Sequence, residues 1–517
     1  MRASPLLAVL LMLSPLIGAA VVWLPRWPRR RRPHPAQVGR FQDLATIMTS
    51  LVSLGLTAII AGTYQENLQF RLSIVHFHLD ALSIYFVLLV NVIALAASFS
   101  AAPSVARRTA MGGRDAAPFY CLFNLFHFTM VLVPMVENLV VLWIAIELTT
   151  VTSTFLVASE RRREALEAAW KYIIITSTGI IFALLGTLFL ASAIPPGSQA
   201  FTSMNWPDLQ RVAGDLDPDL VRLSFLFVLV GYGTKAGFAP MHTWLPDGHG
   251  EAPYPVSAML SGVLLKSALY AILRFYTITN KALGDGGLFA SRLLLGSGLL
   301  SLVVATPFIL KRNPFKRVLA YHSLEHMGII AFGIGIGGPV ALFGALLHAL
   351  NHGVTKSLMF LAYGSVQENY RPSRRLEDDY EGVLRVMPWT GVVLAVGGLA
   401  LVGSPPFNIF FSEFLILWGA VSRAVDQPTL VLIAAIALFL LSVTVIFGGL
   451  VRHLSRILMG NAPDRFQPET LRQVTPLLAL LLLVVVFGLM VPTFGPLDLR
   501  DLLDKSVTAV CGGVTCP

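Results

Sequence analysis

Charged side chains are scarce in this sequence. Only 13% of its 517 residues are Asp, Glu, Lys or Arg, whereas a soluble domain carries about 25%. Hydrophobic residues make up 55% of the chain, which excludes an ordinary water-soluble protein. The composition predicts an all-α integral membrane protein, with residues 1–517 forming a single polytopic membrane domain in the lipid bilayer.

Cysteine is rarer still, with three residues in the chain. Three are too few for a disulfide framework, a four-cysteine iron–sulfur site or a zinc ribbon. Cys511 and Cys516 lie in the C-terminal tail, where they either pair or stay as free thiols. The glycine-rich stretch Gly333–Gly338 has no strand before it, which favours close helix packing over a dinucleotide loop. No cofactor is therefore expected in this chain.

Long apolar runs are abundant. A transmembrane helix needs about 20 mostly apolar residues, and fourteen runs come near that length. The first has no small-residue cleavage pattern after it, which favours a retained span over a signal peptide. The fourteen runs cover residues 5–24, 43–63, 79–101, 118–136, 138–158, 171–193, 220–240, 256–276, 291–310, 319–337, 339–363, 388–420 (broken), 429–451 and 474–494.

Basic residues indicate the orientation of these runs. Arginine and lysine gather in every second connection, as in Arg161–Arg163 after the fifth run, and are sparse in the others. The positive-inside rule then places the basic connections in the cytoplasm and both termini in the periplasm of a bacterial inner membrane. This topogenic excess accounts for the net charge of +9, so no nucleic-acid partner is expected.

Lys235 is the most unusual residue of the apolar runs. It lies in the stretch Leu226–Pro240, among glycines and a proline that weaken or interrupt a helix. A lysine at bilayer depth costs about 2.5–3.5 kcal/mol on insertion scales. Broken membrane helices with an ionisable group at the break are also where transporters place ion sites. We therefore expect Lys235 to have a partner, a water path or a task within the membrane.

Further ionisable residues share this setting. Burial disfavours the charged form, so a buried lysine or carboxyl group can exchange a proton near neutral pH, and histidine titrates there without perturbation. Paired polar groups that merely hold helices together are the structural alternative. Their summed insertion cost, about 15 kcal/mol, favours proton transfer instead. The predicted proton relay consists of Glu147, Lys235, Lys266, His348, His352, Lys356 and Glu413.

Two other groups are candidates for accessory roles. His322, Glu325 and His326 begin the tenth run. A second cluster, in the predicted cytoplasmic loop after Pro240, contains His242, Asp247, His249 and Glu251.

Metal binding is the competing interpretation of the histidines. His348 and His352 have the helical spacing of metal ligands, but Lys356 continues the same face and would repel a cation. Loop capping or a proton entry fits the loop cluster better. No metal site is expected.

One long motif starts at Lys235. It reads Lys235-Ala-Gly-Phe-Ala-Pro-Met-His-Thr-Trp-Leu-Pro-Asp247 and continues with Glu251-Ala-Pro253 and Pro255-Val-Ser-Ala258. This motif resembles the signature of the antiporter-like subunits of respiratory complex I, membrane-bound hydrogenases and Mrp-type cation/proton antiporters. The resemblance covers nearly the whole chain.

That resemblance implies a fold and a set of roles. The family fold has about fourteen transmembrane helices, with two inverted five-helix repeats that each contain a broken helix. The repeats would cover 118–276 (helices 4–8) and 291–451 (helices 9–13). The central relay residues would be Glu147, Lys235, Lys266 and Glu413. The link between half-channels would be His348, His352 and Lys356.

Within the family, the chain is most similar to the F component of hydrogenase-4-type complexes. The residues concerned are Ala320–Gly328, Ser404-Pro-Pro-Phe407 and Ser412-Glu-Phe414. Glu325 stands where quinone-reducing relatives usually carry a small polar residue.

The resemblance implies a proton-translocating subunit of a redox-driven complex. Its partners would be other membrane subunits and a peripheral redox arm, which would hold the redox chemistry. Three other functions fit the same residues: a cation/proton antiporter module, in which sodium could replace protons, the membrane half of an inorganic-carbon uptake complex, and a structural membrane anchor.

Overall fold

The computed structural model describes residues 5–24, 35–64, 67–72, 75–112, 116–284, 287–370, 380–461, 466–490, 493–494 and 497–512. The helices are α1 (Pro5–Val21), α2 (Pro35–Gly62), α3 (Ala81–Gly112), α4 (Ala117–Leu132), α5 (Leu139–Val157), α6 (Arg163–Ser192), α7 (Gln199–Ser203), α8 (Trp206–Arg211), α9 (Pro218–Ala236), α10 (Trp244–Glu251), α11 (Tyr254–Met259), α12 (Leu265–Leu283), α13 (Leu288–Leu310), α14 (Phe315–Ile336), α15 (Gly338–Asn369), α16 (Val383–Val386), α17 (Pro388–Leu401), α18 (Asn408–Asp426), α19 (Leu430–Leu458), α20 (Leu471–Leu489) and α21 (Leu499–Val510). Two antiparallel hairpins complete the structure, β1 (Leu68–Leu72) with β2 (Val75–Leu79) and β3 (Thr493–Phe494) with β4 (Leu497–Asp498).

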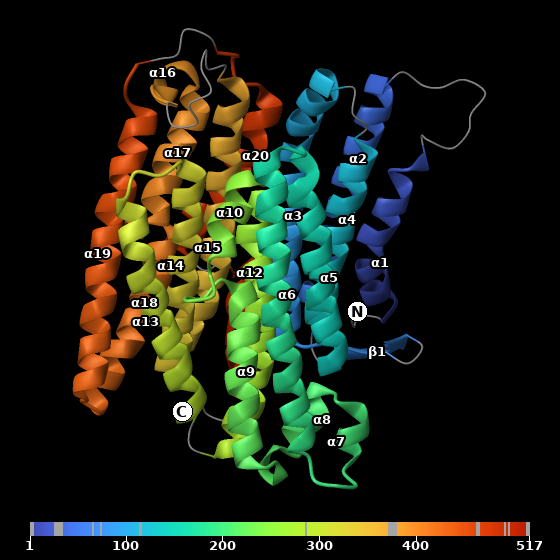
Figure 1. Cartoon of the computed structure of the whole chain (residues 1–517), viewed down its shortest axis with the longest axis vertical. Helices are drawn as coiled ribbons and strands as arrows, with labels where there is room; N and C mark the ends of the chain where they lie inside the picture. The colour runs from blue at the N-terminus through green and yellow to red at the C-terminus, as the bar shows by residue number, and fades with distance from the viewer. Residues whose placement is uncertain are drawn as a thin grey trace.

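The predicted all-α membrane class is confirmed. Within the described ranges, ten helices are long and apolar enough to cross a membrane, and the long helices run up and down in one bundle (Figure 1). Helix α1, with 17 residues, is too short to count among the ten. Helices α9, α14 and α15 are also not among them, although the sequence predicts spans there. Ionisable residues and glycines lower the hydropathy of these three helices.

Burial separates an inner set of helices from an outer set. The membrane-spanning window of Tyr254–Leu283, which contains α12, is 100% buried. On the outside, α19 exposes Leu430 by 84% and Val431 by 74%. Such an apolar surface fits contact with lipid. The centre of the bundle is thus shielded from lipid.

Two helices are interrupted at glycines. Helix α9 ends at Ala236, where Gly237 takes φ +82°. The run 388–420 divides into α17 and α18, and Gly403 between them takes φ +68°. Glycine adopts such positive φ values readily because it lacks a Cβ atom. Both interruptions predicted from the sequence are therefore present.

Glycines also permit close helix contacts, as predicted for Gly333–Gly338. A β-carbon on Gly335 would collide with the backbone of Leu295, and one on Gly328 would lie 2.8 Å from the carbonyl oxygen of Gly298. Helices α13 and α14 consequently pack backbone to backbone.

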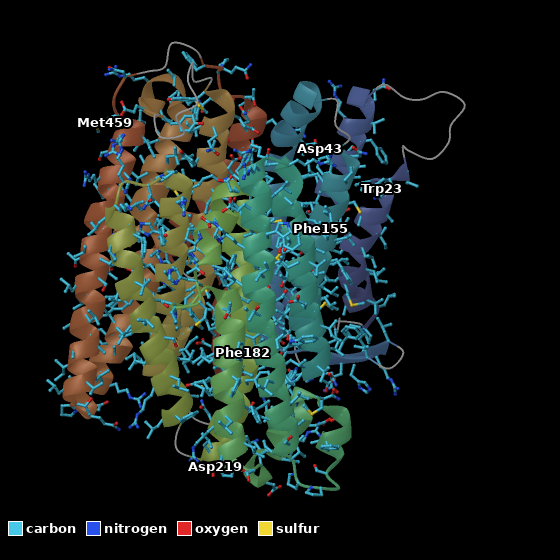
Figure 2. The ribbon with its side chains drawn as sticks, in the orientation of Figure 1. Trp23, Asp43, Phe155, Phe182, Asp219 and Met459 are labelled. Carbon is cyan, nitrogen blue, oxygen red and sulfur yellow. The ribbon has the colours of Figure 1, made fainter. Side chains whose placement is uncertain are left out.

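The two ends of the bundle differ. Trp23, Asp43 and Met459 lie at one end, and Asp219 lies at the other (Figure 2). The marks for both chain termini lie nearer the end that holds α7 and α8 than the end that holds α16 (Figure 1). Cys511 is disulfide-bonded, whereas Cys516 falls outside the described residues.

Candidate functional site

Polar side chains are buried along the middle of the bundle. Glu147 and Glu413 are half-buried. The fully buried members of the predicted relay, each 0% exposed, are Lys235, Lys266, His348, His352 and Lys356. The structure divides these residues into two clusters.

The first, which we call the Lys235 cluster, joins α5, α6 and α9. Lys235 Nζ donates hydrogen bonds to Thr150 Oγ1 (2.6 Å) and to the Tyr172 hydroxyl (2.8 Å). The Thr150 hydroxyl in turn donates to Glu147 Oε2 (3.2 Å), and Ser177 donates to Glu147 Oε1 (2.6 Å). Glu147 and Lys235 are therefore linked through a hydroxyl group rather than by an ion pair.

Local backbone geometry places Lys235 in this cluster. It lies in the last turn of α9, directly before the interruption at Gly237. The indole of Trp244, at the start of α10, donates to the carbonyl of Thr234 (2.8 Å), which also accepts the backbone N–H of Gly237 at this helix end. The lysine side chain is thereby held at the point where regular helix stops.

The second, which we call the histidine cluster, begins at Lys266. A π-helical segment, Leu260–Leu264, precedes α12. This distortion turns the carbonyl of Ser261 toward Lys266 Nζ, which donates to it (2.6 Å) and also to His352 Nδ1 (2.7 Å). π-Segments of this kind are common at functional sites.

A row of histidines continues from His352. Its ring stacks on His326 at 4.7 Å between centroids, and His326 Nδ1 lies 3.0 Å from His348 Nε2. His348 Nδ1 then lies 3.0 Å from the hydroxyl of Ser412. The row therefore crosses from α15 through α14 to α18.

Glu413 lies at the end of this row. One of its carboxylate oxygens lies within 4.8 Å of ring nitrogens of both His326 and His348. Glu413 Oε2 also fills the space beside Gly403 that a side chain would otherwise occupy. The glycine at the helix interruption thus makes room for the carboxylate.

Two accessory candidates join the histidine cluster and Lys356 lies beside it. His322 Nδ1 lies 2.7 Å from Glu325 Oε2, while Lys356 Nζ donates to the carbonyl of Leu319 (2.5 Å). The structure therefore brings His322, Glu325 and His326 to the predicted relay. Among the described side chains, no hydrogen bond or ion pair joins the Lys235 cluster to the histidine cluster.

The loop candidates are arranged differently from the prediction. Asp247, His249 and Glu251 lie on a short helix, α10, not in a loop. Asp247 pairs with Lys171 (3.3 Å) and Arg317 (2.9 Å). Because basic connections flank this helix on several sides, its carboxylates serve as their counter-charges.

Among the described residues, His242, His249 and Glu251 do not form a metal-binding cluster with Asp247. Glu251 pairs with Arg162 at 3.3 Å, and the buried ring of His249 stacks on Phe360 at 5.4 Å. His242 is buried. Groups that could hold a metal ion were found, within the described ranges, only in the histidine cluster.

Two overlapping triads there have ligand atoms within 4.8 Å of one another, His322/Glu325/His326 and His326/His348/Glu413. Tetrahedral zinc needs its ligand atoms about 2.0–2.3 Å from the ion. His326 belongs to both triads, and its Nδ1 atom lies at hydrogen-bonding distance, 3.0 Å, from His348 Nε2. The ammonium group of Lys266 contacts His352 in the same cluster and is itself a cation. The histidine and glutamate side chains of the triads therefore fit a shared proton better than a metal ion, which would be a second cation.

Several functional residues carry no signal in the sequence. Thr150, Tyr172, Ser177, Ser261 and Ser412 supply the hydrogen bonds described above, yet serine and threonine occur throughout the apolar runs. Only the spacing of Glu147 and Thr150, three residues apart on one helix, could have indicated a contact.

Comparison with known proteins identifies the family of the chain. Residues 136–444, more than half of the chain, match the family described as NADH:quinone oxidoreductase/Mrp antiporter, TM. A hydrogenase-4 component F homolog of Methylacidiphilum infernorum is 37% identical, over 80% of this chain and 86% of that protein. Hydrogenase-4 component B of Escherichia coli is 30% identical over 72% of this chain, which spans about half (54%) of that protein. The predicted resemblance to hydrogenase-4-type components is confirmed.

Solved structures share the fold. A chain of the archaeal membrane-bound sulfane sulfur reductase superimposes with a TM-score of 0.81 at 24% identity, covering 98% of this chain and 97% of its own. A chain of respiratory complex I from Thermus thermophilus gives 0.78 at 22% identity, covering 98% and 99%. A chain of the Mrp complex from Dietzia gives 0.78 at 18% identity, covering 98% of each. The chain is a multi-pass, antiporter-like membrane subunit and belongs to the NADH:quinone oxidoreductase/Mrp antiporter family.

Proposed function

We propose that this subunit carries protons through the Lys235 cluster and the histidine cluster, as part of a hydrogenase-4-type, redox-driven complex. The observation that carries this proposal is the direct contact of Lys266 Nζ with His352 Nδ1, 2.7 Å, inside a fully buried set of titratable groups. A lysine and a histidine at this distance share one proton, because the neutral ring nitrogen accepts what the ammonium group donates.

The proton would then follow the histidine row. His352 and His326 stack rather than hydrogen-bond, so this step requires a ring rotation or one water molecule. Transfer from His326 to His348 is direct at 3.0 Å. Glu413, within 4.8 Å of both rings, is the final acceptor of the row.

The Lys235 cluster would load the row. Thr150 and Tyr172 bind the ammonium group through neutral oxygens, so Lys235 can lose its proton without leaving a carboxylate unpaired. Transfer from there to Lys266 requires water or a conformational change, since the two clusters are separate in the described structure. Coupling to a partner could act at this gap.

The repeat architecture and orientation belong to the same proposal. Fourteen spans result if the interrupted pair α17 and α18 counts as one and α1, α9, α14 and α15 are included. The glycine interruptions at Gly237 and Gly403 support two inverted repeats over 118–276 and 291–451. Both termini would face the periplasm of a bacterial inner membrane, with the ion-paired basic connections in the cytoplasm.

The partners follow from the composition of the site. The chain offers acids, bases and hydroxyl groups suited to proton transfer, and we propose that it contains no redox cofactor or metal of its own. Electron transfer would occur in a peripheral arm, beside other membrane subunits. Protons are the proposed cargo, rather than sodium, because lysine and histidine nitrogens bind protons and repel alkali cations once protonated.

The test uses the complete complex in proteoliposomes. His352→Asn keeps a polar side chain but removes the titratable ring, and should lower proton flux about tenfold or more at unchanged assembly. His453→Asn is the matched control, since this buried histidine lies outside the relay and bonds the backbone carbonyl of Ile309 (3.0 Å). Parental flux in the His352 variant would refute the proposed relay.

A further inference from the structure

A buried ion pair halfway along α12 has no part in the relay described above. Arg274, 1% exposed, donates from Nη1 to Asp80 Oδ2 (2.7 Å) and from Nη2 to Asp80 Oδ1 (2.6 Å). Asp80 directly precedes α3 and accepts the backbone N–H of Ser83 (2.8 Å). Burial disfavours the carboxylate, but the charge of Arg274 outweighs burial and lowers the pKa of Asp80 to about 2. The pair is therefore ionised at neutral pH.

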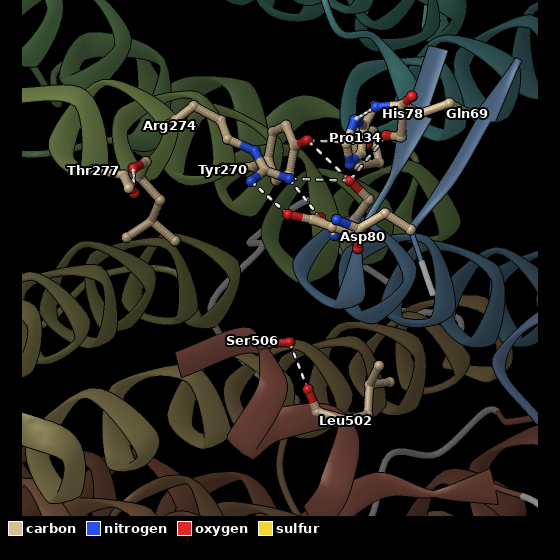
Figure 3. Close-up of polar contacts among 12 residues, drawn as sticks. Gln69, His78, Asp80, Pro134, Tyr270, Arg274, Thr277, Leu502 and Ser506 are labelled. Carbon is tan, nitrogen blue, oxygen red and sulfur yellow. Dashed lines mark hydrogen bonds and ion pairs between the residues drawn. The ribbon is translucent and has the colours of Figure 1, made fainter. Parts of the chain in front are cut away.

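Hydroxyl groups connect this pair to the interior. The Tyr270 hydroxyl lies 3.1 Å from Ser83 Oγ, which also accepts from Arg274 Nη2 (3.1 Å). Figure 3 shows Tyr270 and Arg274 extending from the same helix toward Asp80. Lys266, Tyr270 and Arg274 are spaced four residues apart and share one face of α12. That face runs from the histidine cluster to the ion pair.

The polar groups that extend from Lys266 to the ion pair approach the surface through the β1–β2 hairpin. His78 on β2 lies two residues before Asp80, and its Nδ1 lies 3.0 Å from Nε2 of the exposed Gln69 on β1. The indole of Trp206 covers Arg274, with the guanidinium carbon 3.9 Å from the ring centroid. His78 Nε2 has no hydrogen-bond partner among the described atoms and could receive a proton.

A structural clamp between α3 and α12 would explain the ion pair alone. Buried ion pairs are often no more stabilising than well-packed apolar residues, so a clamp does not require one. A clamp also does not explain why Lys266 and Tyr270 share the face of this buried helix that carries Arg274, with Ser83 of α3 beside Tyr270.

We propose that Tyr270 and Ser83 form an outward proton exit from Lys266, which the Asp80–Arg274 ion pair closes. This exit rests on the proposed function. A proton from Lys266 reaches the Tyr270 oxygen through one water molecule. The phenolic hydrogen, which the Pro134 carbonyl accepts at rest (3.0 Å), turns to Ser83, and the hydrogen of Ser83, which the His78 carbonyl accepts at rest (3.4 Å), turns to Asp80. Each hydroxyl group keeps one hydrogen, and Lys266 is left neutral.

Protonation of Asp80 removes the charge that holds Arg274, and the pair opens. The proton then leaves by way of His78, and the restored carboxylate recaptures the guanidinium. Because Arg274 cannot lose its proton, its charge opposes protons that return from outside while the pair is closed. The ion pair thus serves as a gate, and the two hydroxyl groups carry the proton.

The test compares hydroxyl-deleting variants in proteoliposomes that contain the complete complex. Tyr270→Phe and Ser83→Ala should each lower proton flux per assembled complex about tenfold or more. Tyr276→Phe is the matched control: it removes a buried hydroxyl from the same helix, one that contacts Ser291 at 2.9 Å. This control should keep the parental flux.

A second measurement separates a gate from a clamp. Arg274→Gln keeps the carboxylate that carries the proton but removes the charge that opposes its return, and should raise the passive proton leak of resting proteoliposomes severalfold. If Arg274→Gln lowers only the melting temperature and leaves the leak unchanged, the pair is a clamp and the gate is refuted.

Lys235→Met is the reference for the proposed function. Loss of flux in Lys235→Met together with parental flux in both Tyr270→Phe and Ser83→Ala would refute the exit but leave the relay intact. Parental flux in Lys235→Met would refute the relay, and the exit with it.

Discussion

Among the described contacts, Lys235 is joined to Glu147 through the hydroxyl group of Thr150, which lies 2.6 Å from the lysine nitrogen and 3.2 Å from the carboxylate. A direct ion pair would hold the lysine charged. An intervening hydroxyl lets the lysine exchange its proton while Glu147 keeps its bond to Ser177.

The first prediction follows from this geometry. Thr150→Val keeps the shape of the side chain but removes the bridging hydroxyl, and should lower proton flux about tenfold. Thr150→Ser should retain most of the flux. Thr152→Val on the same helix is the control, because its hydroxyl bonds only backbone carbonyls within α5 among the described contacts. Equal flux in the Val and Ser variants would contradict the bridge.

The second prediction concerns Lys235 itself. Lys235→Met should leave assembly and partner redox activity measurable while proton translocation falls. Lys235→Arg should not restore translocation, because a guanidinium cannot release its proton near neutral pH. Assembly and flux are measured separately in proteoliposomes. Normal flux in the arginine variant would show that the residue is only a structural cation.

The third prediction concerns Glu413. Glu413→Gln preserves the shape beside Gly403 but cannot titrate, so pumping should fall while assembly persists. The flux of the purified complex, normalised to its assembled amount, gives the result. An unchanged pumping rate would assign Glu413 a packing role.

The fourth prediction is a dependence of stability on pH. Burial, with the nearby Arg274, lowers the pKa of His78 to about 4, although Asp80 opposes the shift. The unfolded chain, with a histidine pKa near 6.5, then binds more protons than the folded protein between pH 6.5 and 4. Stability should therefore be complete above pH 6.5 and fall as the pH decreases to 4.

His78→Gln should flatten this profile. The melting temperatures of the purified parent and variant at pH 7 and pH 5 test it, since the contribution of Asp80, whose pKa is about 2, is lost only at lower pH. Parallel profiles for the two proteins would contradict the assignment.

The fifth prediction concerns orientation. Arg162 pairs with Glu251 at the end of the bundle that carries the basic connections, and we expect this end to face the cytoplasm. A cysteine placed at position 162 should resist a membrane-impermeant reagent in intact cells and react after permeabilisation. Labelling in intact cells would reverse the proposed topology.

Much of the architecture could be predicted because its signals are local. The interruption at Gly403-Ser-Pro-Pro406 was readable from residues that do not continue a helix, and it separates α17 from α18. The sequence also contains a strand signal for the hairpin of β1 and β2, since Leu68–Leu72 and Val75–Leu79 alternate apolar and polar residues. The apolar runs on either side of this segment predict membrane helices, so the hairpin was missed.

The contacts of the site could not be predicted in the same way. Lys266 and His352 are buried ionisable residues, which made each a candidate, but their contact spans 86 residues of sequence. The π-segment Leu260–Leu264 that turns the Ser261 carbonyl toward Lys266 has no local motif. The sequence predicts a loop for Asp247 and Glu251, because it contains no sign of the cations that pair with them on α10.

The low hydropathy of α9, α14 and α15 has a consequence for biosynthesis. A nascent helix enters the bilayer by its own partitioning between the translocon and lipid, and buried lysines oppose this step. Helix α13 is among the strongly apolar spans, and glycines on both helices let α14 pack on it backbone to backbone. The two can therefore leave the translocon as one hairpin, in which the earlier helix shelters the polar one that follows it.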